Sequence, residues 1–199
     1  MSSATQVAAV ILAAGASSRM GSPKPLLELA GETFLDRLIG IFAGVCRPVI
    51  VVLGYHADEI RAGIRRGSMA EIVVNPAPER GMLSSLQCGL ARVPEGASVM
   101  FTPVDYPGIS RETVEALAAA GDAAVAIPMY EDRRGHPVKV SSMVVAELLR
   151  LPLEAQARDV IRQHGDSVIF VEVPDAGIVN DVDTPEAYRE LTAQWGART

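Results

Sequence analysis

Short apolar runs alternate along the chain with segments in which apolar residues recur at helical spacing. Phe34, Leu38 and Ile41, for example, fall on one face of a helix. This alternation predicts an α/β fold in which a mostly parallel sheet lies between two helical layers. Strands are expected at 7–13, 48–53, 71–75, 97–105, 123–128 and 167–173, and helices at 33–42, 58–66, 83–93, 111–119, 148–153, 155–164 and from 185 onward.

Polar residues support several of these helix boundaries. Thr33 and Ser110 each precede a helical segment and suit its N-cap. Thr184 is followed by Pro185 and Glu186, which suit the N-cap, the first turn and the positive end of a helix. We therefore expect the last helix to begin directly after Thr184.

Length and composition indicate a soluble protein of one domain. The 199 residues fit a single domain, 1–199, in which we find no internal repeat or linker. Hydrophobic residues make up 49%, yet no apolar run approaches the roughly 20 residues that a membrane span requires. The first residues, MSSATQ, lack the features of a signal peptide, so we expect a cytoplasmic protein with no membrane partner.

The net charge and the cysteines narrow the possible partners and roles of the protein. The net charge of −6 argues against nucleic acid as a partner, and it means that a polyanionic substrate must be held by local cations and a metal. The two cysteines, Cys46 and Cys88, are far apart among apolar residues. We interpret them as small core residues.

The segment 10–27, VILAAGASSRMGSPKPLL, follows the first predicted strand and is rich in Gly, Ser and Ala. Small residues allow backbone N–H groups to close around an anion, and Arg19 and Lys24 supply positive charge. Neither common phosphate-loop pattern fits, because Ser22 and Pro23 separate Gly21 from Lys24 and GxGxxG is absent. A surface loop with solvated cations is the alternative.

The run LAAGASSRMGSPKPLL resembles the signature of nucleotidyltransferases, most closely the molybdenum cofactor cytidylyl- and guanylyltransferases. The resemblance implies a Rossmann-like three-layer α/β/α fold of the nucleotidyltransferase (GT-A-like) type. It also implies that Arg19 neutralises the leaving pyrophosphate and that Lys24 acts at the α-phosphate. The implied nucleotide-binding residues of this loop are Leu12, Ala13, Ala14, Gly15 and Gly21.

The segment NPxxxxGMxxSL, which begins at Asn75, resembles the nucleobase and acceptor loop of the cytidylyltransferase branch. It implies nucleotide-binding roles for Asn75, Gly81 and Ser85. Gly81 and the serines fall at a predicted helix N-terminus, where free N–H groups point outward. Ordinary helix capping by Ser84 is the alternative explanation of the serines.

Two acidic residues stand at positions suited to a metal ion. Asp105 ends the predicted strand 97–105 and should face the crevice at the carboxyl end of the sheet. It resembles the metal-binding Asp of the family, and the turn NDVDTPE resembles the family's second metal motif. This implies that Asp105, also a catalytic residue, and Asp183 hold Mg²⁺, with Asp181 as a second choice for the latter position.

The element RGHPV resembles one that lies on the acceptor side in the cytidylyltransferase relatives. It implies that Arg134 and His136 contact the acceptor, at its phosphate or its pterin. A polar turn with solvated arginines explains the same residues equally well.

Taken together, the resemblance implies a Mg²⁺-dependent enzyme that moves CMP from CTP onto the phosphate of molybdopterin and releases pyrophosphate. CTP is expected because the cytidylyl branch has LAAG, with Ala14, where the guanylyl branch has LAGG. Ala14 is otherwise simply a small residue that the turn requires. Guanylyl transfer to the same cofactor, transfer to a sugar or polyol phosphate and a non-catalytic nucleotide sensor are alternatives. A molybdoenzyme is a possible partner.

Overall fold

The computed structural model describes residues 6–121 and 123–196 and is built around an eight-stranded sheet. The strand order is β10-β7-β9-β6-β1-β4-β5, and β8 pairs with β7. The strands are β1 (Val7–Ala13), β4 (Val49–Leu53), β5 (Glu71–Val74), β6 (Ser98–Pro103), β7 (Val125–Tyr130), β8 (Arg133–Arg134), β9 (Val138–Val140) and β10 (Val168–Glu172).

Most of the sheet is parallel. β1 pairs in parallel with β4 and β6, β4 with β5, and β10 with β7, whereas β9 runs antiparallel between β6 and β7. The predicted mostly parallel α/β fold is therefore confirmed. Because β1, β4 and β6 share one direction, their carboxyl ends meet at one edge of the sheet, which is where such folds bind ligands.

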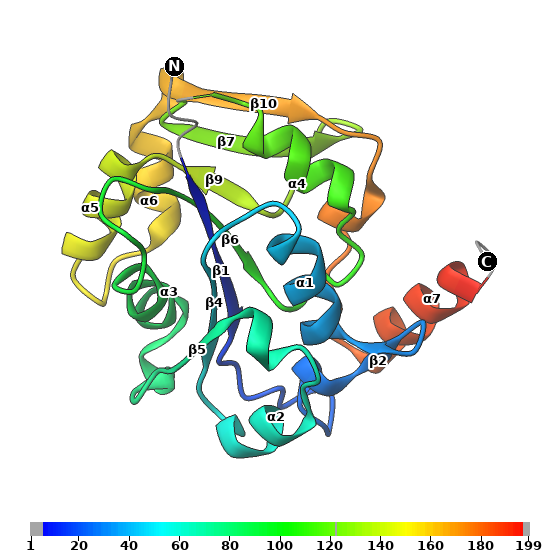
Figure 1. Ribbon diagram of the computed structural model, residues 1–199. Helices are drawn as coiled ribbons and strands as arrows, with labels where there is room; N and C mark the ends of the chain where they lie inside the picture. Colours follow the sequence, from blue (N-terminus) through cyan, green and yellow to red (C-terminus); the bar gives the residue numbers. More distant parts are fainter. Residues whose placement is uncertain (1–5, 122, 197–199) are drawn as a thin grey trace.

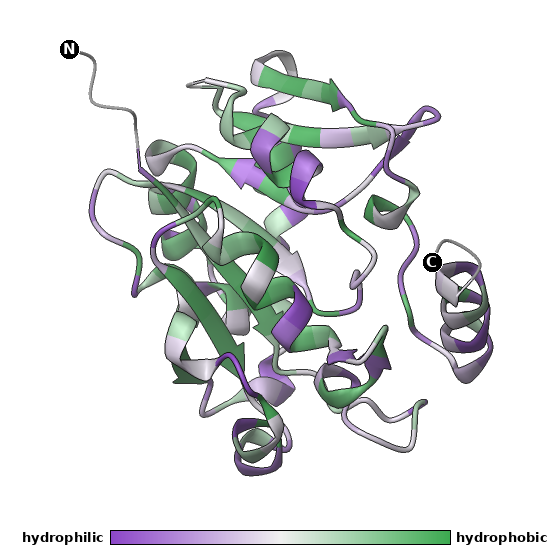
Figure 2. Ribbon diagram, turned by 45° about the vertical axis from the view of Figure 1, so that its right-hand side comes forward, coloured by the Kyte–Doolittle hydropathy of each residue, from purple (hydrophilic) through white to green (hydrophobic). Residues whose placement is uncertain are grey.

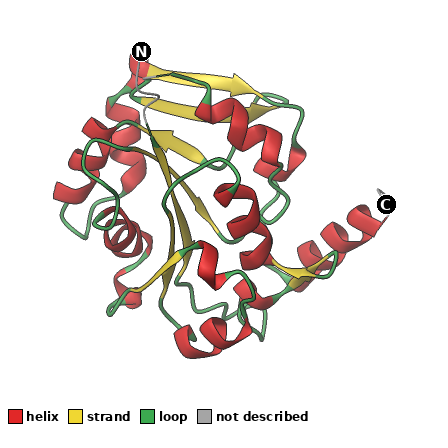
Figure 3. Ribbon diagram, viewed as in Figure 1, coloured by secondary structure: helices red, strands yellow, loops and turns green. Residues whose placement is uncertain are grey.

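Helices cover both faces of the sheet (Figures 1 and 3). One face carries α1 (Phe34–Ala43) and α4 (Arg111–Ala118). The other carries α3 (Met82–Leu90), α5 (Ser142–Arg150) and α6 (Ala157–Gln163), while α2 (Ala57–Gly63) lies near the carboxyl end of β4. The last helix, α7 (Pro185–Gly196), projects from the body of the molecule (Figure 1).

Short elements complete the chain. A two-stranded hairpin, which the sequence pattern does not predict, pairs β2 (Glu28–Leu29) with β3 (Glu32–Thr33). The 3₁₀ helices are η1 (Lys24–Leu26), η2 (Gly67–Met69), η3 (Pro78–Arg80), η4 (Gly165–Ser167) and η5 (Ala176–Ile178).

Apolar side chains form a core on each side of the sheet, as the hydrophobic colouring of its strands indicates (Figure 2). Phe34 and Phe42 of α1 are fully buried in one core, and Leu86 and Leu90 of α3 are buried in the other. Cys46 is also fully buried, and its burial raises the pKa of the thiol to about 12. The expected role of Cys46 as a core residue is confirmed. Cys88 is partly exposed.

The predicted caps are confirmed at three helices. The side chains of Thr33, Ser110 and Thr184 accept hydrogen bonds from backbone N–H groups in the first turns of α1, α4 and α7. Ser84 does not cap α3, because Gly81 is the N-cap and the Ser84 hydroxyl instead bonds within the preceding turn. Pro185 begins α7 as expected.

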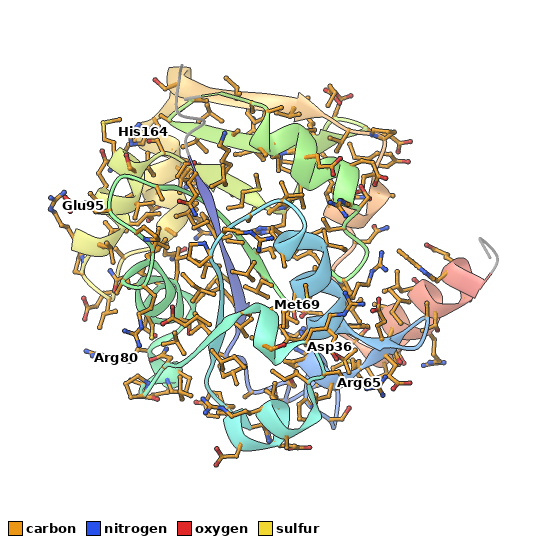
Figure 4. The ribbon with its side chains drawn as sticks, viewed as in Figure 1. Asp36, Arg65, Met69, Arg80, Glu95 and His164 are labelled. Carbon is orange, nitrogen blue, oxygen red and sulfur yellow. The ribbon has the colours of Figure 1, made fainter. Side chains whose placement is uncertain are left out.

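The helix predicted at 58–66 is wrong at its end, because α2 stops at Gly63. The cause is a tertiary contact. The carboxylate of Asp36 accepts hydrogen bonds from the backbone N–H groups of Arg65 and Arg66, at 2.9 and 2.8 Å, and this holds them outside the helix. Asp36, in the first turn of α1, and Arg65 are labelled next to each other in Figure 4.

Other boundaries also differ, since α3 ends at Leu90 rather than at 93 and β6 ends at Pro103 rather than at 105. The helix predicted at 148–153 begins much earlier, at Ser142, because Ser141 caps it, and it ends before Pro152. The strand predicted at 123–128 instead spans Val125–Tyr130, because pairing with β10 and β8 extends it.

Within the described residues, no helix combines the length and apolarity that crossing a bilayer requires.

Asp36 provides a test of this packing. We expect Asp36→Ala to lower the free energy of unfolding by about 3 kcal/mol, because two amide groups lose their partner and Thr33 loses an acceptor. Urea unfolding followed by circular dichroism measures this change. The matched control Asp58→Ala removes an exposed first-turn carboxylate of α2 and should cost less than about 1 kcal/mol. Equal losses in the two variants would contradict the assignment.

Candidate active site

The loop 14–23 leaves the carboxyl end of β1 and folds back on itself. Ser17 and Gly21 have positive φ angles of 52° and 70°. The Ser17 hydroxyl accepts a hydrogen bond from the backbone N–H of Lys24 at 2.9 Å, and the Ser17 carbonyl accepts one from Met20. These contacts place Lys24 at the start of η1, beside the ends of the central strands.

Lys24 brings together the two acids that the sequence suggests as metal ligands. Its Nζ lies 2.5 Å from Asp183 Oδ1 and 3.2 Å from Asp105 Oδ1. Arg19 lies 3.2 Å from the other oxygen of Asp183. Only 12% of the Lys24 side chain is exposed, against 69% for Arg19, so Lys24 is the cation inside the cluster and Arg19 is at its edge.

The two carboxylates have different surroundings. Burial raises the pKa of Asp105, and Lys24 offsets only part of that effect. The hydrogen bond from Lys24 lowers the pKa of Asp183, which is more exposed, and Arg19 adds to the same effect. Burial also raises the pKa of Tyr106, and the carboxylates of Asp181, Asp105 and Asp183 reinforce that effect. Asp181 is thus near the acids without joining their contacts to Lys24.

A cavity of about 300 Å³ opens beside this cluster. It lies between the loop after β1, the start of α3 and the end of β6. Most residues predicted for the site line it, namely Leu12, Ala13, Ala14, Gly15, Arg19, Lys24, Gly81, Ser85, Asp105 and Asp183. Gly21, Asn75, Arg134 and His136 are not among its lining residues.

Asn75 shapes the cavity from behind. It is buried, and its side-chain amide donates hydrogen bonds to the hydroxyls of Ser84 and Ser85 at 2.9 and 3.0 Å. Its carbonyl oxygen accepts one from the Ala77 N–H. Gly81, with φ of 92° and ψ of −172°, has a backbone that glycine readily adopts. Asn75 therefore positions the start of α3, including Ser85.

The side chains of the two residues predicted for the acceptor contact different parts of the molecule. The guanidinium of Arg134 is 4.5 Å from the ring centre of Phe170 in β10. The imidazole of His136 is 4.7 Å from the ring of Tyr106, the residue directly after Asp105. Burial lowers the pKa of His136 to about 4, so the imidazole is neutral at pH 7. His136 is thus next to the acids but carries no charge for a phosphate.

Tyr55, Pro78 and Met82 are among the cavity residues that the sequence pattern does not single out. Tyr55 is 38% exposed and Met82 63% exposed. A large apolar side chain beside the expected ligand loop, directly after Gly81, is the signal that points to Met82. Arg80, next to Gly81, points away from the molecule (Figure 4).

Helix α1 supports all parts of this site. The Phe34 N–H donates to Leu27 O, just after η1, and the Phe34 ring packs edge-on against Tyr188 of α7. Arg37 donates a 2.7 Å hydrogen bond to Pro107 O, just after Asp105, and lies 4.4 Å from the ring centre of Trp195 in α7. One helix thus fixes the segments that carry Lys24, Asp105 and Asp183.

The donor set fits a hard divalent cation. Within the residues that the structure describes, no group of three or more His, Cys, Asp or Glu side chains is arranged to hold a metal. Two carboxylates that face one cation are the sparse oxygen set with which Mg²⁺ is held together with substrate phosphates. Asp105 and Asp183 would therefore share such an ion with a nucleotide.

Comparison with known families decides the class. The family model described as the MobA-like NTP transferase domain matches residues 9–168, which include the loop, Lys24 and Asp105. The chain belongs to this family. It is a nucleotidyltransferase, as the loop signature predicts, and its cavity and charged cluster occupy the ligand edge of the sheet in this member of the family.

Relatives within the MobA-like family carry different names. The molybdenum cofactor cytidylyltransferase of Escherichia coli (strain K12) is 28% identical over 179 residues, which cover 90% of this chain and 92% of the relative. The nicotine blue oxidoreductase of Paenarthrobacter nicotinovorans is 32% identical over 198 residues, covering 93% and 96%. These two names describe different reactions, so overall sequence similarity does not identify the reaction or the substrate. The residues of the site are the remaining evidence.

Solved structures agree with the fold. A homologue of Mycobacterium tuberculosis Rv0371c from Mycobacterium sp. strain JC1 has a TM-score of 0.83 at 32% identity, covering 97% of this chain and 98% of that one. Rv0371c of M. tuberculosis H37Rv, solved as a complex with manganese, has a TM-score of 0.74 at 28% identity, covering 95% and 99%.

The neutral His136 gives a pH prediction. Its pKa in the folded chain, about 4, is below the ordinary 6.5, so between these values the unfolded chain binds the proton more readily. We expect the free energy of unfolding to fall by about 2–3 kcal/mol between pH 7 and pH 4.5 from this residue. Urea unfolding at both pH values should show a smaller fall in His136→Gln than in wild type. The same fall in wild type and His136→Gln would refute the assignment.

Proposed function

We propose that this protein transfers CMP from CTP to the terminal phosphate of molybdenum cofactor, with a divalent metal ion and release of pyrophosphate. The observation that carries the proposal is the cluster of Lys24, Asp105 and Asp183 at the edge of the cavity, under a loop of Gly and Ser residues. Positive charge and two carboxylates beside a backbone anion site are the parts that phosphoryl chemistry requires.

Each part has a role in the transfer. The acceptor phosphate oxygen attacks the α-phosphorus, a new P–O bond forms, and the bond to the β-phosphate oxygen breaks. Backbone N–H groups of the loop 13–21 bind the triphosphate, and Arg19 neutralises the departing pyrophosphate. Lys24 acts at the α-phosphate, where negative charge develops. Asp105 and Asp183 hold the metal, Mg²⁺ in our proposal, which supplies Lewis acidity when bound.

Molybdenum cofactor is proposed as acceptor because the E. coli relative of nearly full-length similarity is a molybdenum cofactor cytidylyltransferase. A phosphate monoester is already a nucleophile at neutral pH, so no catalytic base is required. Tyr106 and the neutral His136 provide an aromatic surface beside Asp105, which suits a pterin ring. Arg134, stacked on Phe170, is a more distant candidate contact. The proposal includes a cytoplasmic location and delivery of the product to a molybdoenzyme.

A redox reaction is the second candidate, because one relative of nearly full length is named nicotine blue oxidoreductase. Reduction of an organic substrate would require a hydride donor such as a nicotinamide dinucleotide. The loop lacks the GxGxxG pattern with which dinucleotide folds bind the pyrophosphate, and the acids beside Lys24 have no role in hydride transfer. These two facts favour nucleotidyl transfer.

Pyrophosphate release with CTP, GTP, ATP and UTP, with and without molybdenum-loaded molybdopterin, tests the proposal. We expect release with CTP only when the acceptor and Mg²⁺ or Mn²⁺ are present. Asp105→Asn should lower kcat at least about 1,000-fold, because one metal ligand is lost, whereas the exposed control Asp58→Asn should retain activity. The redox alternative would be supported instead if the protein oxidised added NADPH in the presence of an organic substrate and released no pyrophosphate. Full activity of Asp105→Asn would refute the site.

Nucleotide choice is proposed to depend on Ala14. Its carbonyl accepts the Tyr55 N–H at 3.3 Å, and a Cβ at Gly54 would lie 2.9 Å from the Ala14 methyl. The two loops, after β1 and after β4, therefore approach each other closely at Ala14 and Gly54, and in our proposal the Ala14 methyl group narrows the cavity at this point. This narrowing limits the room for a purine at the cavity wall.

We expect Ala14→Gly to change the ratio of kcat/KM for CTP to that for GTP by about 10-fold toward GTP, equivalent to about 1.4 kcal/mol. Steady-state pyrophosphate assays with both nucleotides measure the ratio. Ala16→Gly, in the same loop, controls for added backbone freedom and should leave the ratio unchanged. A wild-type preference for GTP, or the same shift in both variants, would remove Ala14 as the determinant.

A further inference from the structure

Lys24 occupies the position between the two proposed metal ligands. Its ammonium group lies 2.5 Å from an oxygen of Asp183 and 3.2 Å from an oxygen of Asp105. With Arg19 also paired to Asp183, two cations and two anions form a neutral cluster. The positive charges of Lys24 and Arg19 therefore balance the two carboxylates.

The backbone of Lys24 is held in place, so its ammonium group can change position only by rotation of the side chain. The N–H of Lys24 donates to the Ser17 hydroxyl, and the residue lies between Pro23 and Pro25, whose rings restrict the chain. A change of side-chain rotamer is the motion available to the ammonium group. Its new partner must be an anion in the adjoining cavity, since Lys24 is mostly buried.

Resting on the proposed function, we propose that Lys24 prevents free metal from binding, so that the site accepts its divalent ion only as a metal–nucleoside triphosphate complex. A divalent cation that enters alone must approach the ammonium group closely or expel it without a new partner, and like charges repel strongly in such a site. A triphosphate supplies oxygen anions for both Lys24 and Arg19. Nucleotide and metal then strengthen one another's binding by the same factor.

This role differs from the charge stabilisation already given to Lys24, and it predicts a gain of binding on its removal. Mn²⁺ binding without nucleotide, measured by electron paramagnetic resonance of the free ion, should be at least 10-fold tighter in Lys24→Met than in wild type. Methionine keeps much of the side-chain length without the charge. The control Arg150→Met removes an exposed charge at the end of α5 and should stay within 2-fold of wild type.

The same titration with α,β-methylene CTP, which is not cleaved, tests the coupling. In wild type the analogue should tighten Mn²⁺ binding by a factor at least 10 times larger than in Lys24→Met. Lys24→Gln serves as a second variant, and thermal unfolding confirms that each variant is folded. Equal or weaker nucleotide-free Mn²⁺ binding in both folded variants would overturn the inference.

Asparagine variants separate this inference from the proposed function. Asp105→Asn and Asp183→Asn should each weaken Mn²⁺ binding in the presence of the analogue. If neither does, the metal site itself is wrong and the proposed function fails with it. If both do, while the Lys24 variants gain no affinity for free Mn²⁺, only the role of Lys24 as a barrier to free metal is refuted.

Discussion

The ion pairs of Lys24 are the interaction on which the site depends, because they join three segments that are distant in sequence. Lys24 follows the loop after β1, Asp105 follows β6, and Asp183 precedes α7. The parallel pairing of β1 with β6 brings the first two to the same edge of the sheet. Asp183 reaches that edge only because α7 returns to it from the opposite end of the chain.

Helix α1 makes this meeting possible without taking part in the chemistry. Its Phe34 and Arg37 contact the chain beyond Lys24, the loop beyond Asp105 and two aromatic residues of α7. The burial of α1 against the sheet, with Phe34 and Phe42 fully enclosed, gives these contacts a rigid base. The site geometry is thus an extension of the core.

Local sequence pattern was sufficient for the parallel sheet, for three helix caps and for the residues of the loop after β1. The pattern was insufficient where a distant residue decides the outcome. Asp36 ends α2 early by binding the N–H groups of Arg65 and Arg66, and pairing with β10 and β8 shifts β7. The burial of His136 beside Tyr106 likewise depends on the packed fold. Periodicity describes which face of an element is apolar, but it does not describe which polar partner meets it.

Helix α7 projects from the body of the molecule, whereas α1, α3, α4, α5 and α6 cover the faces of the sheet (Figure 1). Of the described residues of α7, Leu191 is the buried one, and Tyr188 and Trp195 contact Phe34 and Arg37 of α1 through their rings. An element with so little buried surface opens at a lower free energy than the core does. Detachment of α7 would carry Asp183 away while the sheet stayed folded. Because the proposed mechanism needs Asp183 as a metal ligand, it implies that inactivation by heat precedes the loss of secondary structure.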